Sequence, residues 1–241
     1  MNQFVAKQRN QMPLFALCLG FFMVIIDVTI VNVALPSMAK NLGGGVSWLQ
    51  WVVDGYTLTF ACLLLSSGSF GDRVGARPAY LSGLALFILT SLACGMATNF
   101  LLLTIFRLLQ GIAAALLVPT SVALINASYE NRMERARAIG VWAGVGGLAA
   151  ASGPVLGAIL TAWLGWRGVF FVNIPVGLLG ILLTIKYVVN PIPANHPGGF
   201  DFSGQVIGII SIASLAFSLI EAGRFGWSSE IVIIGLCIFF I

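Results

Sequence analysis

The sequence predicts an all-α protein that crosses a membrane several times, and three observations support this prediction. Of its 241 residues, 59% are hydrophobic and 8% are charged, whereas soluble domains carry about 25% charged residues. The hydrophobic residues form runs of about 20, the length that a helix needs to cross a bilayer. The connections between the runs are too short to hold a soluble domain. This composition excludes a soluble enzyme and a disordered chain.

Seven runs are long enough to span a bilayer, and each is bounded by polar residues, glycine or proline. They cover residues 13–35, 46–70, 79–97, 100–126, 138–162, 167–189 and 203–222. An eighth run begins near residue 230 and reaches Ile241; it would cross only about 18 Å of a hydrocarbon core of about 30 Å. We therefore expect the chain to end inside a helix. The first run carries Asp27 and lacks a small-residue cleavage site, which argues against a signal peptide.

The distribution of lysine and arginine predicts a cytoplasmic N-terminus, because basic residues collect in cytoplasmic loops. With this orientation the inner set is Lys7, Arg9, Arg73, Arg77, Arg132, Arg135, Arg137 and Lys186, and the outer set is Lys40, Arg167 and Arg224. Five tryptophans fall at the outer ends of the predicted helices, where indole rings favour the interface: Trp48, Trp51, Trp163, Trp166 and Trp227. The net charge of +4 thus reports orientation, and we expect no nucleic-acid partner.

Three ionisable side chains fall inside predicted spans, where charge is costly and usually functional. Asp27, Asp54 and Arg107 lie about 13, 10 and 12 Å from the outer ends of their helices at 1.5 Å per residue, so all three share one depth. One interpretation is an ion pair that only fixes helix packing. The other is a protonation site in which Asp27 is the first candidate carrier and Asp54 the second, while Arg107 stays charged. Asp54 could also simply be solvated, and Glu221 is expected at the interface.

The connection between the second and third runs contains glycines and charges at regular spacing. It holds Gly68, Gly71, Asp72, Arg73, Gly75 and Arg77, followed by Pro78. Gly71 and Gly75 would permit a tight reversal of the chain, and the three charged residues would cluster at the inner surface. This segment resembles the signature loop of the major facilitator superfamily, with Ala76 in place of a usual basic residue.

Three other segments resemble motifs of the same superfamily. Asp27 to Pro36 is similar to the first-helix motif of its fourteen-span drug:proton antiporters, and Leu103 to Ala115, with Arg107, to its fourth-helix motif. The fifth run resembles an antiporter motif through Gly140, Gly144, Gly153, Pro154 and Gly157, although Ala149 and Ala158 replace two of its glycines. Gly153 and Pro154 are expected to bend this helix, and its small residues to let helices approach closely. Ordinary helix packing is the alternative interpretation of the fifth-run pattern.

The resemblance implies a six-helix amino-terminal transporter domain in residues 1–189, built from two inverted three-helix repeats. A cytoplasmic loop would follow in 190–202, and a linker helix with an incomplete eighth helix in 203–241. The implied function is proton-coupled export of drugs or other amphipathic molecules by alternating access, in the cytoplasmic membrane. The partners would be the substrate, protons, lipid and a second half of the transporter. The alternative is a non-transporting remnant or a split subunit. A nutrient importer is a weaker match, because the first-helix and fifth-helix motifs belong to antiporters.

No residue pattern indicates an enzyme, a metal site or a cofactor site. The cysteines Cys18, Cys62, Cys94 and Cys237 each lie in an apolar run, so we expect buried free thiols without metal spacing. His196 lies in a polar connection and is assigned no chemistry. The energy source is expected to be an ion gradient, since no nucleotide-binding motif is present.

Overall fold

The computed structural model describes residues 11–191 and 202–240, and the secondary structure within these ranges is helical, which confirms the all-α prediction. The helices are α1 (Met12–Leu42), α2 (Val46–Val74), α3 (Ala76–Met96), α4 (Phe100–Ser128), α5 (Arg132–Leu164), α6 (Gly168–Phe171), α7 (Asn173–Tyr187), α8 (Phe202–Phe225) and α9 (Glu230–Phe239). With α6 and α7 counted as one span, seven helical segments are long and apolar enough to cross a membrane. His196 and most of the predicted loop 190–202 lie outside the described residues.

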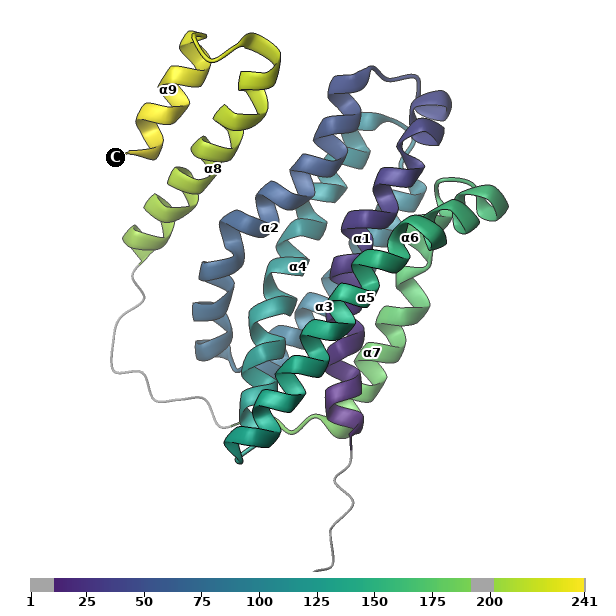
Figure 1. The fold of residues 1–241 in the computed structure, drawn as a ribbon, viewed down its shortest axis with the longest axis vertical. Coiled ribbons are helices and arrows are strands. Elements are labelled where there is room, and N and C mark those ends of the chain that lie inside the picture. The colour runs from purple at the N-terminus through teal and green to yellow at the C-terminus, as the bar shows by residue number, and fades with distance from the viewer. Residues whose placement is uncertain (1–10, 192–201, 241) are drawn as a thin grey trace, which may run out of the picture.

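Helices α1 to α7 form one bundle, in which α2 packs along α4 and α1 packs along α5 (Figure 1). If α1–α3 and α4–α7 are inverted repeats, α4 corresponds to α1 and α5 to α2. The two pairings would then be equivalent, so the packing agrees with the expected repeats, which themselves remain a prediction.

Two glycines let these paired helices touch through their backbones. A Cβ atom added at Gly111 of α4 would lie 2.5 Å from the carbonyl oxygen of Tyr56 in α2. A Cβ atom added at Gly157 of α5 would lie 3.0 Å from the carbonyl oxygen of Ile30 in α1. Small residues at such crossings are the usual means of close packing between membrane helices. These contacts fix α2 and α1 against their partners, and so they fix the side chains that α1, α2 and α4 carry inward.

The sequence predicts a loop between the second and third spans, and this prediction is wrong. Helix α2 continues through Asp72 and Arg73 to Val74, and α3 begins at Ala76, so Gly75 alone separates them. Gly75 has a φ of +104°, which glycine tolerates and other residues rarely adopt. A helix has no need to end at the edge of the hydrocarbon, because its polar last turn can extend into water. Gly71 is therefore helical, and it provides packing space rather than a turn: a Cβ there would lie 2.8 Å from Cγ2 of Thr120.

The predicted sixth span is interrupted. It divides into α6 and α7, with Val172 between them. Pro175 explains the interruption, because proline has no N–H to donate to the carbonyl of Phe171 and its ring crowds that carbonyl. By contrast, Pro154 lies inside the continuous helix α5. The bend expected at Gly153 and Pro154 stays a prediction.

Helices α8 and α9 form a hairpin that lies beside α2 (Figure 1). The two helices approach closely at Gly235, where an added Cβ would lie 3.3 Å from the carbonyl oxygen of Ser214. Helix α9 has 10 residues.

Three side chains differ from their expected exposure. Glu221 was expected at the interface but is buried, as are its neighbour Ala222 and Val232 of α9, since the chain folds back over this end of α8. Trp166 is buried and contacts Phe170 edge to face, so it belongs to the core. Cys237 is an exposed free thiol on α9, whereas the other three cysteines are buried and free, as expected.

Candidate functional site

The centre of the bundle holds a buried ion pair between Asp27 of α1 and Arg107 of α4. Nη1 of Arg107 donates to Oδ2 of Asp27, and the two side chains are 1% and 0% exposed. The shared depth predicted from the sequence therefore corresponds to direct contact for these two residues. A charge-assisted bond of this kind, out of water, is among the stronger polar contacts in proteins.

Arg107 is held by three further groups. Its Nε donates to the carbonyl oxygen of Val52 at 2.9 Å, and its Nη1 also donates to Oε1 of Gln110 at 2.9 Å. The guanidinium carbon lies 4.2 Å from the ring centre of Tyr56, close enough for a cation–π interaction. Helix α2 thus contributes a carbonyl and an aromatic ring to the site.

Asp27 receives hydrogen bonds from two amides through its other carboxylate oxygen. Oδ1 accepts from Nε2 of Gln110 at 3.2 Å and from Nδ2 of Asn173 at 3.1 Å. The hydroxyl oxygen of Ser91 accepts from the same two amide nitrogens, at 2.7 Å and 3.0 Å. The donor cluster of Arg107, Gln110 and Asn173 therefore surrounds Asp27 with N–H groups, an arrangement that suits an ionised carboxylate.

Asp54 shares the depth of the ion pair but not its position. Its side chain is half-buried, and among the described residues no hydrogen bond or ion pair joins its carboxylate to Asp27 or Arg107. The reason is angular. Two residues along a helix rotate the side chain by about 200°, so Asp54 points away from the face that carries Val52 and Tyr56.

The charged residues of the segment from Gly68 to Arg77 lie in two different environments. Asp72 and Arg73 are exposed on the last turn of α2. Arg77 instead turns inward within the chain, and its Nη2 donates to the carbonyl oxygen of Ile185 at 2.7 Å. This carbonyl lies in the last turn of α7, where helix carbonyls lack partners along the helix. Arg77 therefore ties the start of α3 to the end of α7.

We expect Arg77→Ala to destabilise the bundle by about 1 kcal/mol, the usual contribution of one hydrogen bond. Arg132→Ala, at an exposed arginine at the start of α5, should change stability by less than about 0.5 kcal/mol. The apparent melting temperature in detergent measures both. Equal values for the two variants would contradict the capping role of Arg77.

The fifth-helix motif has two faces. Gly153 and Gly157 face α1: a Cβ at Gly153 would overlap the hydroxyl of Thr29, and one at Gly157 would touch Ile30. Among the described residues, nothing lies within 4 Å of a Cβ added at Gly140 or Gly144. Unlike the first pair, the second pair therefore leaves open space beside α5.

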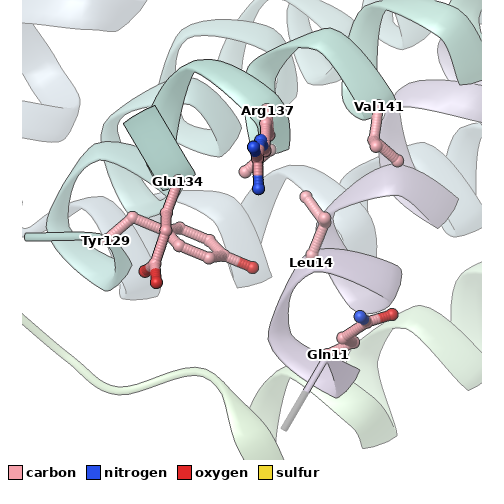
Figure 2. A pocket seen from close by; sticks show the side chains of 7 residues that line it. Gln11, Leu14, Tyr129, Glu134, Arg137 and Val141 are labelled. Atoms are coloured by element: carbon pink, nitrogen blue, oxygen red, sulfur yellow. The ribbon is translucent and has the colours of Figure 1, made fainter. Parts of the chain in front are cut away.

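A pocket of about 260 Å³ with polar and apolar lining residues lies at the helix ends, apart from the ion pair (Figure 2). It is lined by Gln11, Leu14, Tyr129, Glu134, Arg137, Ala138 and Val141. Asp27 is 16 residues further along α1 than Gln11, or about 24 Å at 1.5 Å per residue. The pocket is therefore at the end predicted to be cytoplasmic and has no contact with the buried charges.

Comparison with known families gives a match to the Major Facilitator Superfamily over residues 17–241. The chain belongs to this superfamily. The recognition made from the motifs is thus confirmed. The spans of the chain are those of a multi-pass membrane protein.

The relatives of this chain include proteins that are named for drug resistance. It is 40% identical to the multidrug resistance protein Stp of Mycobacterium tuberculosis, over 93% of this chain and 42% of the relative. It is 38% identical to the methylenomycin A resistance protein of Bacillus subtilis, over 92% of this chain and 47% of the relative. The chain thus spans less than half the length of these relatives. In fold it resembles the peptide transporter POT, solved in complex with sulfate, with a TM-score of 0.69, 15% identity and coverage of 98% of this chain and 50% of that one.

The sequence interpretation missed the neutral members of the site. Gln110, Ser91, Asn173 and Tyr56 all contact the buried pair or its partners. Gln110 follows Arg107 by three residues, the helical spacing that brings side chains together. Its contact with Arg107 could therefore have been predicted. Ser91 and Asn173 are polar residues inside apolar runs. A survey of neutral as well as charged polar residues in the spans would have included both.

Proposed function

We propose that this chain is the amino-terminal half of a proton-driven exporter of drugs or other amphipathic molecules. Inward movement of protons would drive outward movement of the substrate by alternating access. Asp27 would carry the proton, and Arg107 would hold the ionised form of the carboxylate in place. The exposed Asp72 and Arg73 would close the inner side against the second half.

One observation carries this proposal: a carboxylate and a guanidinium, both buried, form a pair within the membrane-spanning part of the chain. Ionisable groups are costly there and usually mark ion or substrate pathways. A carboxylate is the member of the pair that can gain and lose a proton, because arginine stays charged. The relatives named for multidrug and methylenomycin A resistance support a drug or antibiotic as the substrate class.

Asp27→Asn is expected to abolish proton-driven transport without preventing membrane insertion. Asparagine keeps the size of the side chain and an oxygen acceptor for Arg107, but it cannot take up a proton. The test uses everted membrane vesicles from cells that express the gene encoding this chain, with ethidium as a fluorescent amphipathic cation. A pH gradient should drive ethidium accumulation in the wild type and not in the variant, and an immunoblot of the membrane fraction checks insertion.

Asp54→Asn is the matched control, because it makes the same substitution at a carboxylate outside the pair. We expect it to retain transport, and Asp27→Glu to retain part of it. Wild-type accumulation in Asp27→Asn would overturn the assignment of Asp27. Loss of accumulation in Asp54→Asn alone would make Asp54 the carrier.

The second half of the transporter is the partner that this proposal requires. The open space around Gly140, Gly144 and Gly147 on α5 supports a contact there with further helices. The alternative is a remnant or a split subunit that cannot transport by itself. The mass of the native membrane product distinguishes the two: about twice 25.5 kDa favours a single longer chain, and 25.5 kDa favours the split form. A tag at the N-terminus, tested for accessibility in intact cells, examines the proposed cytoplasmic orientation in the cell membrane.

A further inference from the structure

Among the described residues, the groups hydrogen-bonded to the carboxylate of Asp27 are all donors, so none of them would accept a proton from its carboxyl group. Oδ2 faces an N–H of Arg107, and Oδ1 faces N–H groups of Gln110 and Asn173. A protonated carboxyl has an O–H that must itself donate. Proton uptake by Asp27 therefore requires at least one of these three donors to turn away or to turn over.

Two of the three donors are held in place by other strong contacts. Arg107 is also bound to the carbonyl of Val52 and lies against the ring of Tyr56. Gln110 presents Oε1 to Arg107, and Sγ of Cys94 lies 3.7 Å from the same oxygen. If the Gln110 amide turned over, its N–H groups would face the guanidinium, which is unfavourable.

Asn173 is held by groups that can reverse their roles. Its Nδ2 donates to Asp27 and to the hydroxyl oxygen of Ser91. If Asp27 takes up a proton, the carboxyl becomes a donor. The Ser91 hydroxyl can rotate to donate as well. A turned-over Asn173 amide would then accept from both groups, and Ser91 would still accept from Gln110.

We propose that Asn173 is the positioning residue that responds to the protonation of Asp27, turning its carboxamide from donor to acceptor. This inference rests on the proposed role of Asp27 as a proton carrier. It adds a way in which protonation of a residue on α1 changes the hydrogen bonds of a residue on α7. Asn173 is the first residue of α7, next to the interruption at Val172 that Pro175 imposes. A change in its side-chain hydrogen bonds therefore occurs at the point where the backbone hydrogen bonds of the sixth span are interrupted.

The pocket beside Asn173 supplies no other side chain that could accept the proton. It has a volume of about 140 Å³ and lies between α1, α5 and α7, and apart from Asn173 its lining is apolar and includes Ile26, Ile30, Leu156 and Val172. Asn173 is therefore the polar group of this lining, and it already contacts Asp27.

Infrared difference spectroscopy of the purified chain in lipid nanodiscs tests this proposal without any transport measurement. Titration with acid should produce the carboxylic acid band of Asp27, identified by its loss in Asp27→Asn. A side-chain amide band should change with the same midpoint and disappear from the difference spectrum in Asn173→Leu.

Thr184→Val is the matched control, because it removes a buried polar group from α7 outside the donor cluster; its difference spectrum should keep the amide band of the wild type. If Asn173→Leu does not fold, Ser91→Ala removes the other partner of the Asn173 amide and should alter the amide band while the carboxyl band remains. An amide band that does not follow the carboxyl band, or one that persists unchanged in the folded variants, overturns the proposal. Because the readout is spectroscopic, a failure here is distinct from a failure of proton-driven export.

Discussion

Replacing Gly111 with alanine is expected to destabilise the bundle by about 3 kcal/mol, the upper end of the usual cost of overpacking. The added Cβ would lie 2.5 Å from the carbonyl oxygen of Tyr56 and 3.1 Å from the backbone nitrogen of Phe60. Backbone atoms of a neighbouring helix cannot rotate aside as a side chain can. The contact also lies one turn from Arg107, so α2 would be pushed away from the site that Tyr56 and Val52 complete.

The same substitution at two other glycines should cost less stability, because the new methyl group has different neighbours there. At Gly153 the added Cβ would meet the hydroxyl and Cβ of Thr29, but the nearest backbone atom, the nitrogen of Ile30, is 3.3 Å away, farther than the carbonyl oxygen at Gly111, so a smaller loss is expected. At Gly147 no described atom lies within 4 Å, and alanine favours a helix over glycine. Gly147→Ala should therefore change stability by less than about 1 kcal/mol, in either direction.

Apparent melting temperatures of the three purified variants in detergent measure this order. The expected ranking of stability is Gly147→Ala above Gly153→Ala above Gly111→Ala. If Gly111→Ala melted with Gly147→Ala, the backbone contact between α2 and α4 would have no energetic importance.

The fold follows from the sequence because hydrophobic length is the dominant signal in a membrane chain. The seven predicted spans correspond to seven helical segments. The ends of the helices did not follow, because hydropathy falls where a helix leaves the hydrocarbon, whereas the helix ends where its backbone turns. At α2 these two points are several residues apart, and the turn is made by Gly75 alone.

The site was only partly predictable, for a related reason. Counting residues along a helix gives depth, and depth brought Asp27 and Arg107 to one level, where the structure pairs them. Depth says nothing of the direction of a side chain, which separates Asp54 from the pair. Asn173 could be noted as a polar residue in an apolar run, but its contact with Asp27 could not be predicted, since that contact depends on how the interrupted sixth span packs against α1 and α3.

The two members of the buried pair are expected to respond unequally to removal. Asp27→Leu leaves a guanidinium that cannot lose its charge, among neutral partners such as the Val52 carbonyl and Gln110. An unpaired buried charge costs about 3–5 kcal/mol. Arg107→Leu leaves a carboxylate that can take up a proton and become neutral, so its cost should be about 1–3 kcal/mol, near that of a buried neutral polar group.

Melting temperatures of both single variants and of the double variant Asp27→Leu with Arg107→Leu test this asymmetry. The double variant should be more stable than Asp27→Leu alone, because removing the second charge removes the penalty that the first substitution created. If both single variants lost the same stability, Asp27 would not be the member of the pair that can change its charge.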